Sequence, residues 1–463
     1  MHNAAPSPDP GLRPRRAAVI GAGGLGLAAM KNLLAVGFEV IGYDLADEVG
    51  GNWYIDGPTS RVYESTHTIS TKPFTQYPDF PMPDDWPDYP HQRQMGDYLG
   101  RYADHFDLRR RVRLSTEVVR VDAVEPRNPR TAWDVVSRDA DGRSATERVD
   151  AVVVANGHNW QPKIPHVPGE FTGEVIHSAR YKSAEVLRGK RVLVVGAGNT
   201  GCDIAVEGAQ QAREVLHSTR RGYWYAPKYA FGKPSDQIND LISGLRTPMW
   251  LKQRLMHATI RLTVGNHRRL GLPEPDHAIL TTHPIANSLL PYYVGQGGIR
   301  PVPDVARFEG SRVVFTDGTD AEVDLVVFAT GYLAQFPFLD DEVLDLHDGR
   351  PTLALNMVPP AYDTLAVAGL YQPDSGVFAI AHWQGVLVAE IFDAATTSPQ
   401  QSRRIREQVL TPLRDTTSSS RTLSGGVRFA TSTRHLYEVS HQDYVRALDS
   451  AIDAVRRVRE EAA

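Results

Sequence analysis

Two short apolar runs, each followed by a glycine-rich turn, dominate the pattern of hydrophobic and polar positions. They occupy residues 17–26 and 192–201, and both turns space their glycines as Gly-x-Gly-x-x-Gly. Each turn follows a β-branched run typical of a buried strand and precedes a stretch with the period of a helix. The pattern therefore predicts a strand–turn–helix unit in each half of the chain.

The three glycines of such a turn have separate expected tasks. The first permits the tight exit from the strand, the second lets the backbone approach a pyrophosphate, and the third lets helix and strand pack closely. In that order they are Gly21, Gly23 and Gly26 in the first turn, and Gly196, Gly198 and Gly201 in the second. A glycine turn without a ligand is the alternative for one copy, whereas two copies favour a protein that binds two dinucleotides and transfers a hydride between them.

The strand that follows each turn ends in residues suited to a different nucleotide. Asp44 lies about 20 residues beyond the first turn, where a carboxylate accepts hydrogen bonds from ribose hydroxyls. The corresponding strand of the second unit ends in Arg220 and Arg221. Guanidinium groups bind a 2′-phosphate, which a carboxylate would repel. The second site should therefore prefer NADPH to NADH, unless the two arginines only face solvent. For Asp44 the alternative is a plain strand-end aspartate.

The rest of the apolar pattern predicts an α/β chain in which one lobe is inserted into another. Buried strands at 149–157 and 324–332 both end at a glycine, which suits a chain that leaves one sheet and later returns to it. We expect a disordered leader over 1–14, the first lobe over 15–165, the inserted lobe over 166–322 with a mostly helical insertion at 223–293, and the remainder of the first lobe over 323–463. That remainder should hold a strand at 364–369, an apolar helix at 376–392 and a charged C-terminal helix.

Composition narrows the function classes. A net charge of −5 on 463 residues gives no basis for nucleic-acid binding. The single cysteine, Cys202, excludes a disulfide framework, a cysteine metal cluster and a dithiol flavin reductase. The histidines form no ligand set with carboxylates, so we predict no metal. No uninterrupted apolar run reaches membrane-spanning length, and we expect a cytoplasmic protein without a membrane segment.

Several short motifs together resemble one family. Residues 171–181 fit F-x-G-x-x-x-H-x-x-x-Y, and they lie between the two glycine turns. With Gly-Gly-Asn-Trp at 50–53, Asp-Phe-Pro at 79–81, His-Pro-Ile-Ala-Asn at 283–287 and Phe-Ala-Thr-Gly-Tyr at 328–332, the chain resembles the class B flavin-dependent monooxygenases, specifically the flavin-containing monooxygenases. The resemblance implies two doubly wound Rossmann-like domains, with the NADPH domain inserted into the FAD domain. It also implies that FAD and NADPH use O₂ to oxygenate a nucleophilic N or S atom of a small molecule through a flavin C4a-hydroperoxide.

The resemblance assigns roles to particular residues. Contacts to FAD are expected from Gly21, Gly23, Gly24, Leu25, Gly26, Asp44, Asn52, Trp53, Ser70 and Gln94. Contacts to NADPH are expected from Gly196, Gly198, Asn199, Thr200, Gly201, Arg220 and Arg221. Asn287 should contact a cofactor or the hydroperoxide and His283 should line the substrate passage, although hydrogen bonding within a loop explains both equally well. The family also leaves a homodimer open.

One position departs from the family. Flavin-containing monooxygenases place an asparagine beside the isoalloxazine in a short segment before Asp-Phe-Pro, and counting back from that motif gives Ile69. The isoleucine side chain offers no hydrogen bond, which leaves three alternatives. A neighbouring residue, His67, Thr68, Ser70 or Thr71, supplies the donor. Otherwise the reaction is tuned to an unusual substrate, or the enzyme is an uncoupled NADPH oxidase. Baeyer–Villiger oxygenation of ketones is the other alternative, and it is disfavoured because residues 181–182 read Tyr-Lys rather than Trp-Pro or Trp-Asp.

Overall fold

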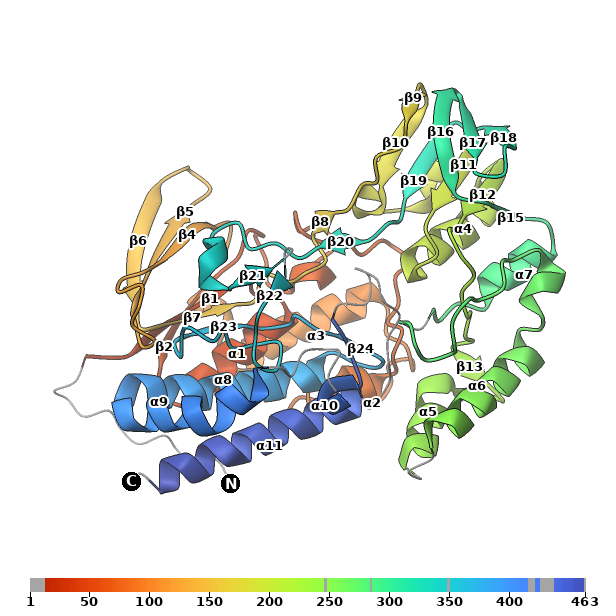
Figure 1. Cartoon of the computed structure of the whole chain (residues 1–463). Coiled ribbons are helices and arrows are strands. Elements are labelled where there is room, and N and C mark those ends of the chain that lie inside the picture. Colours follow the sequence, from red (N-terminus) through yellow and green to blue (C-terminus); the bar gives the residue numbers. More distant parts are fainter. Residues whose placement is uncertain are drawn as a thin grey trace.

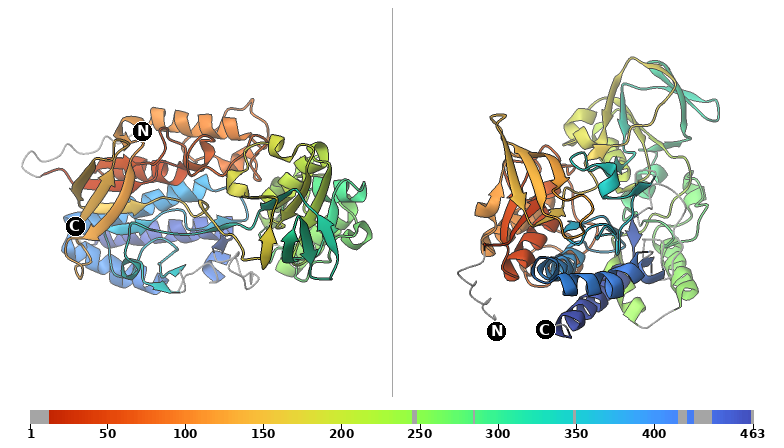
Figure 2. Two further views of the ribbon diagram at one scale, coloured as in Figure 1. Left: turned by 90° about the horizontal axis from the view of Figure 1, so that it is seen from above. Right: turned by 60° about the vertical axis from the view of Figure 1, so that its left-hand side comes forward.

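The computed structural model describes residues 13–244, 248–283, 285–347, 350–414, 421–424 and 437–461. The leader expected over 1–14 therefore lies outside the described residues except for its last two positions. Two lobes lie side by side and are connected by two stretches of chain that run between them, at strands β8 (Gln161–Pro162) and β20 (Tyr332–Leu333) (Figures 1 and 2).

The first lobe is built on a five-stranded parallel sheet. Its strand order is β23 (Leu365–Val367), β7 (Ala151–Val154), β1 (Arg16–Ile20), β2 (Glu39–Tyr43) and β3 (Val112–Arg113). Both faces are covered, because alternate residues of β1 enter different apolar clusters: Ala17 and Val19 on one side, Ala18 and Ile20 on the other. This double burial explains why the strand reads as a continuous apolar run.

Helices and a second sheet cover these two faces. The helical face carries α1 (Gly24–Ala35), α3 (Gln92–His105), α8 (Phe378–Thr397) and α11 (His441–Glu460). The opposite face carries the antiparallel strands β4 (Glu117–Ala123), β5 (Trp133–Arg138) and β6 (Ser144–Val149). Among them, Trp133 is fully buried and its indole N–H donates to Thr364 Oγ1 at 3.0 Å.

The second lobe repeats the design with a sheet of its own. Its parallel order is β10 (Glu174–His177), β19 (Leu325–Phe328), β11 (Arg191–Val195), β12 (Glu214–Ser218) and β15 (Arg300–Val302). One face packs on α4 (Asn199–Gln211) and α7 (Leu289–Gly295). The other packs on the four-stranded sheet β18 (Asp320–Glu322), β17 (Arg312–Phe315), β16 (Val305–Gly310) and β9 (Gly169–Phe171). The expected fold class, two doubly wound Rossmann-like lobes, is confirmed.

The boundary expected between the inserted lobe and the returning first lobe, at residues 322/323, lies one strand too early. Strand β19 pairs with β10 and β11 in the second sheet, so it belongs to the inserted lobe. The chain returns to the first lobe only after it, where Tyr332 and Leu333 pair antiparallel with Pro162 and Gln161. An apolar strand that ends at a glycine looks the same in either sheet, and only pairing tells the two apart.

The insertion at 223–293 is less helical than expected. It begins with a hairpin of β13 (Tyr229–Ala230) and β14 (Lys233–Pro234) and continues into α5 (Ser235–Gly244) and α6 (Met249–Thr263). Phe231 and Gly232 at the hairpin tip both have positive φ, 52° and 76°, as a tight two-residue turn requires. We call residues 227–236 the insertion hairpin segment.

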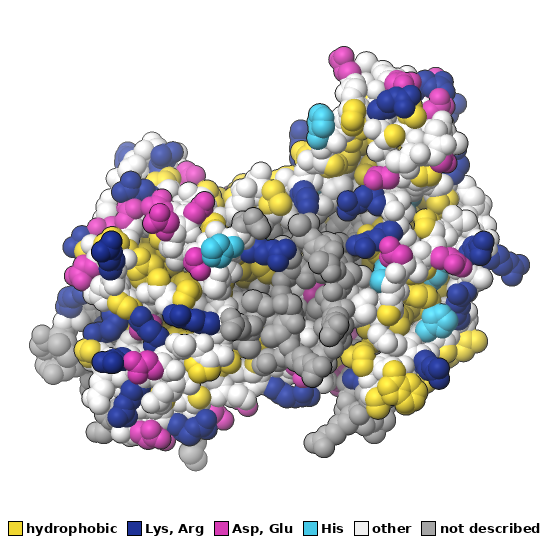
Figure 3. All heavy atoms as spheres, in the orientation of Figure 1, with side chains coloured by type: hydrophobic (Ala, Val, Ile, Leu, Met, Phe, Trp, Pro, Cys, Tyr) yellow, Lys and Arg dark blue, Asp and Glu magenta, His cyan; other side chains and the backbone are white. Residues whose placement is uncertain are grey.

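The remaining short elements complete the first lobe. They are α2 (Lys72–Thr75), β21 (Leu346–His347), β22 (Arg350–Pro351), β24 (Gln372–Pro373), α9 (Pro399–Ile405), α10 (Arg421–Ser424) and β25 (Glu438–Val439). Within the described part of the chain, no helix is both long and apolar enough to cross a membrane. Among the described side chains on the face seen in Figure 3, basic and acidic groups are interspersed over both lobes.

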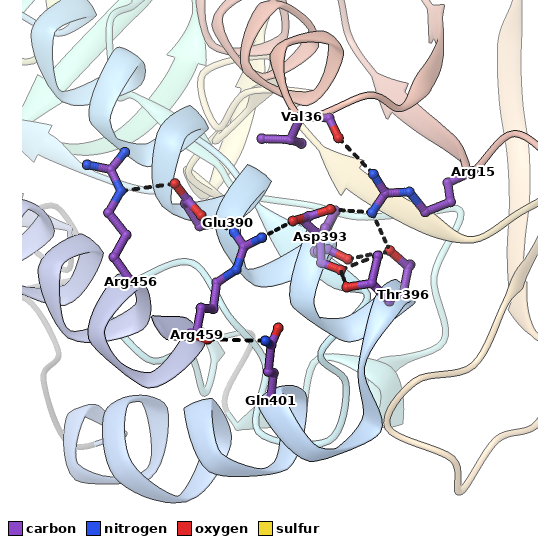
Figure 4. A network of polar contacts seen from close by, with 10 residues as sticks. Arg15, Val36, Glu390, Asp393, Thr396, Gln401, Arg456 and Arg459 are labelled. Carbon is purple, nitrogen blue, oxygen red and sulfur yellow. Dashed lines mark hydrogen bonds and ion pairs between the residues drawn. The ribbon is translucent and has the colours of Figure 1, made fainter. Parts of the chain in front are cut away.

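A network of ion pairs ties the C-terminal helix to the first strand. Asp393 of α8 accepts from Arg15, next to β1, and from Arg459 of α11 (Figure 4). Glu390, one helical turn earlier, accepts from Arg459 and, at 3.0 Å, from Arg456. Because their carboxylates are largely shielded from solvent, these pairs hold α11 against the helical layer more firmly than exposed pairs would.

Candidate functional site

The first glycine turn is a cradle that leaves no room for side chains. A Cβ on Gly26 would lie 1.8 Å from the Gly21 carbonyl oxygen, and one on Gly21 would lie 2.4 Å from that of Ala155. A second loop approaches the same turn, because the Gly50 N–H donates to the Ala22 carbonyl at 3.0 Å and a Cβ on Gly51 would lie 2.8 Å from the Gly23 Cα. Two backbone segments therefore approach each other closely with no side chain between them, as the backbone around a pyrophosphate site does.

Asp44 holds the first glycine turn in place through backbone hydrogen bonds. Its carboxylate accepts the Ala22 N–H at 2.6 Å and the Ala46 N–H at 2.9 Å. Burial raises the pKa of the carboxyl group, and the two backbone donors oppose that rise. Each oxygen has a second lone pair, so the residue can still accept from ribose hydroxyls while it holds the turn. The family contact expected of Asp44 stays a prediction.

The other residues expected at FAD have local partners as well. Asn52 Oδ1 accepts the Arg61 N–H at 2.7 Å, and Trp53 lies beside it, partly buried, in the short helix at 51–53. Gln94 closes a capping box at the start of α3, where its side chain accepts the His91 N–H at 2.9 Å. The fixed positions of Asn52 and Gln94 thus come from backbone contacts, and their contacts to FAD stay predictions.

The second glycine turn has the same geometry. A Cβ on Gly196 would lie 2.3 Å from the Ala329 carbonyl oxygen, and one on Gly201 would lie 2.1 Å from that of Gly196. Gly198 is the N-cap of α4, so the N–H groups at the start of that helix face the turn. Asn199 Oδ1 accepts the Ala286 N–H at 2.9 Å, which ties the turn to the insertion.

The two arginines beyond β12 differ in their surroundings. Arg221 lies over the Tyr223 ring, with 5.8 Å between its guanidinium carbon and the ring centroid. Its Nε donates to the Tyr223 hydroxyl at 3.5 Å. Arg220 is exposed and has no ion pair with any described residue. Of the two, Arg220 has the guanidinium that is free to bind a phosphate.

The segment around Ile69 lies at the boundary between the lobes. Ile69 itself is 39% exposed, whereas Ser70 and Thr71 are buried. Ser70 exchanges a hydrogen bond with Thr75 at 2.8 Å, between the two hydroxyl oxygens. The Thr71 N–H and hydroxyl both donate to Asp236 Oδ2 of the inserted lobe, at 2.6 and 2.9 Å. We call residues 66–71 the Ile69 segment.

A second polar contact crosses the boundary nearby. The Tyr63 hydroxyl donates to Asp203 Oδ2 of α4 at 2.7 Å, and Asn287 Nδ2 donates to the other oxygen at 2.8 Å. Burial raises the pKa of the Asp203 carboxyl, against the effect of these two donors. Asn287 Oδ1 also accepts the Leu290 N–H at 2.8 Å. The structure thus brings Asn287 to the lobe boundary through Asp203, and the cofactor contact expected of it stays a prediction.

His283 does not take part in these contacts and is paired with Glu438 instead. Its Nδ1 lies 3.2 Å from Glu438 Oε2, in the segment that leads into α11. Both side chains are buried. The structure does not place His283 beside the Ile69 segment through any described contact, and its place in a substrate passage stays a prediction. Pro284, within the same motif, lies outside the described residues.

The fingerprint at 171–181 forms the approach to the second lobe. His177 caps the short helix at 178–180 by accepting the Ala179 N–H at 3.0 Å, and burial lowers the pKa of its imidazole to about 4. Tyr181 is fully buried and donates to Glu207. Lys182 Nζ then donates to the carbonyls of three first-lobe residues, Ile55 at 2.9 Å, Ser60 at 3.2 Å and Val62 at 3.3 Å. The fingerprint is therefore a structural joint between the lobes.

Buried polar atoms without partners support a ligand at the boundary. Within the part of the chain that the structure describes, they include Thr68 Oγ1 in the Ile69 segment and Gln92 Nε2 at the start of α3. Such groups are costly to bury unless a ligand or water satisfies them. Together with the two glycine cradles, they fit FAD in the first lobe and a second dinucleotide in the other.

Sequence reasoning missed two charged residues of the insertion hairpin segment. Asp236 binds Thr71, and Lys228 Nζ donates to the Thr68 carbonyl at 3.1 Å. Neither belongs to a glycine turn or to the fingerprint, and no periodicity marks them, so no signal in one sequence could find them. Among the described residues, no group of His, Cys, Asp and Glu has the geometry of a metal site.

Comparisons with known proteins agree with this geometry. A family model described as flavin-binding monooxygenase-like matches residues 14–451. The chain is 32% identical over 410 residues to flavin-containing monooxygenase 5 of Homo sapiens, covering 85% of this chain and 76% of that protein. It is 33% identical over 413 residues to flavin-containing monooxygenase 1 of Sus scrofa, with the same coverage.

Solved structures share the fold. Cyclohexanone monooxygenase from Rhodococcus sp. Phi1 bound to NADP⁺ superposes with a TM-score of 0.66 at 20% identity, covering 97% of this chain and 98% of that one. S-allyl-L-cysteine S-oxygenase from Allium sativum gives 0.64 at 21% identity, covering 97% and 92%. With two nucleotide cradles, a fingerprint between them and these matches over nearly its whole length, the chain belongs to the flavin-binding monooxygenase-like family and is a flavin monooxygenase.

Proposed function

We propose that this enzyme uses NADPH and O₂ to oxygenate a nucleophilic nitrogen or sulfur atom of a small molecule, with FAD as its resident cofactor. The observation that carries the proposal is the pair of side-chain-free glycine cradles on two lobes that share polar contacts at Tyr63, Asp203 and the Ile69 segment. Relatives include dimethylaniline monooxygenase [N-oxide-forming] 2 of Rattus norvegicus, 33% identical over 408 residues, which supports the same reaction class.

The chain's own residues bind and orient the cofactors. The first cradle and Asp44 would hold the pyrophosphate and ribose of FAD, while the second cradle and Arg220 would hold NADPH with its 2′-phosphate. When bound, FAD supplies the hydride acceptance and the oxygen activation, which no side chain can perform. The protein contributes orientation and the exclusion of water at the lobe boundary.

The fingerprint favours a nitrogen or sulfur nucleophile over a ketone. Tyr181 and Lys182 occupy the positions at which the Baeyer–Villiger pattern has Trp-Pro or Trp-Asp. Here Tyr181 bonds to Glu207, and Lys182 bonds to first-lobe carbonyls. The joint between the lobes is therefore built from side chains other than those of the Baeyer–Villiger pattern, which favours a nitrogen or sulfur nucleophile.

Ile69 supports a second candidate function, an NADPH oxidase that releases hydrogen peroxide. The side chain at this position has no donor, and the neighbouring hydroxyls of Ser70 and Thr71 are engaged with Thr75 and Asp236. Without a donor beside the flavin, oxygen reactivity would be retained while transfer to a substrate would suffer.

One experiment separates these functions. The FAD-loaded enzyme is reduced with NADPH without air and is then mixed with O₂ and a panel of tertiary amines, sulfides and ketones. The proposal expects N-oxides or sulfoxides in near-stoichiometric yield per NADPH. Lactones or esters would establish ketone oxygenation, and one peroxide per NADPH with every substrate would establish the oxidase. An enzyme that binds FAD but is never reduced by NADPH would end the proposal.

A further inference from the structure

Lys228, a half-buried residue, places its ammonium group against the Ile69 segment. Its Nζ donates to the Thr68 carbonyl at 3.1 Å and lies 5.2 Å from the centre of the Tyr89 ring. Burial lowers the pKa of this ammonium group, and the charge of Asp203 opposes that effect. A half-buried lysine loses part of its solvation, so its position calls for a local reason.

Hydrogen bonds from Tyr89 and from within the insertion hairpin segment fix the backbone of Lys228. The Lys228 carbonyl accepts the Tyr89 hydroxyl at 2.7 Å and the Ser235 N–H at 2.9 Å. The Ser235 hydroxyl donates to the Pro227 carbonyl at 2.6 Å. Asp236, the next residue, binds Thr71. Lys228 is therefore aimed at the Ile69 segment by a rigid strap rather than reaching it as a flexible surface side chain.

The carbonyl that Lys228 contacts belongs to the same peptide group as the Ile69 N–H. That N–H has no hydrogen-bond partner among the described residues. A charged donor on the carbonyl oxygen polarises the peptide and makes the N–H at its other end a stronger donor. Ile69 thus lacks the side-chain amide that the family has at this position, but its own main-chain N–H is the one that Lys228 polarises.

We infer that Lys228 is a positioning residue of the oxygenation site, which polarises the Thr68–Ile69 peptide so that the Ile69 N–H replaces the hydrogen-bond donor that isoleucine lacks. The inference rests on the proposed function and deepens it. The Thr68 hydroxyl, buried in the same segment without a described partner, marks the place where a ligand completes the polar contacts. The second lobe thereby supplies a charge to the flavin site of the first.

The alternative is a purely structural role, in which Lys228 only holds the two lobes together. Asp236 makes contacts of that kind with Thr71, and Lys72 offers a matched control within the same region. Lys72 Nζ also donates to main-chain carbonyls, those of Pro83 at 3.0 Å and Asp84 at 2.8 Å, but on the coil of the first lobe. A lysine that only stabilises the fold should behave like Lys72.

The test compares Lys228→Met, Lys228→Arg and Lys72→Met, each loaded with FAD. The first readout is the midpoint potential of the bound flavin, because a donor beside the ring favours its more negatively charged reduced form. We expect Lys228→Met to lower the reduced-to-oxidised ratio about tenfold, which is about 30 mV for two electrons. Lys228→Arg should keep the midpoint potential close to that of the wild type, and Lys72→Met should leave the potential unchanged. Equal potentials in Lys228→Met and the wild type, with FAD bound in both, would overturn the inference.

A second readout asks whether the donor is the Ile69 peptide. In the Lys228→Met background, Ile69→Asn should restore both the potential and the ratio of oxygenated product to peroxide, because the new amide no longer depends on the lysine. A double variant that stays as defective as Lys228→Met would also overturn the inference. Thermal unfolding of each variant checks that it is folded. If the wild type itself oxygenates nothing, the proposed function fails, while the potentials still decide the role of Lys228.

Discussion

Replacing Arg220 with alanine should weaken NADPH binding selectively. Arg220 is exposed at the end of β12 and pairs with no described carboxylate, whereas Arg221 is held over Tyr223. A hydrogen bond to a charged group contributes about 1.5–3 kcal/mol. Loss of the 2′-phosphate contact should therefore raise the KM for NADPH roughly 10- to 150-fold, since about 1.4 kcal/mol corresponds to a factor of ten. NADH lacks that phosphate, so its KM should hardly change.

The assay is the steady-state rate of NADPH or NADH oxidation in air at varied nucleotide concentration. Arg221→Ala is the matched control, and it should raise the KM for NADPH less because Arg221 is already engaged with Tyr223. Equal effects of Arg220→Ala on both nucleotides would refute the phosphate assignment. A larger effect of Arg221→Ala than of Arg220→Ala would mean that the stacked guanidinium, not the free one, binds the phosphate.

Three further substitutions test the fold and the site. Gly26→Ala should cost about 1–3 kcal/mol of stability and lower the FAD content of purified protein, because its Cβ would lie 1.8 Å from the Gly21 carbonyl oxygen; a fully flavinylated variant would contradict this. Asp393→Asn should lower the free energy of unfolding in urea by about 1–3 kcal/mol, since the carboxylate bonds to two arginines; an unchanged midpoint would show that the ion pairs of Asp393 add nothing to stability. The imidazole of His177 has a pKa lowered from 6.5 to about 4, so the unfolded chain binds a proton that the folded chain does not, and stability falls as the pH drops from 6.5 towards 4. His177→Asn keeps a capping acceptor and should flatten that pH dependence in urea titrations, whereas an unchanged slope would assign it to other groups.

The nucleotide-binding units were accessible from sequence because their physics is local. A glycine that would clash through a Cβ, an apolar run buried on both faces and a polar strand end all lie within about 30 residues of one another. Both glycine turns, the two sheets and the family followed from such patterns. The same holds for the apolar helix at 376–392, which the structure extends to Phe378–Thr397.

What the sequence could not provide depends on pairing between distant segments. Strand β19 could join either sheet, because its four residues are fully apolar and buried in the one it chose. Asp236 reaches Thr71 across 165 positions, and Lys228 reaches Thr68 across 160. These contacts depend on how an insertion folds back over another lobe, which neither periodicity nor spacing encodes.

Opposite charges at the lobe boundary link the two nucleotide sites physically. Asp203 lies on the helix that begins at the second glycine turn, and its carboxylate accepts from Tyr63 of the first lobe. Its charge also acts on Lys228, which contacts the Ile69 segment. Because burial raises the pKa of Asp203 and lowers that of Lys228, each group helps to keep the other ionised. Moving α4 relative to the Ile69 segment would separate this pair and leave both charges less compensated. The contacts of Asp203 and Lys228 therefore favour one relative placement of the two lobes.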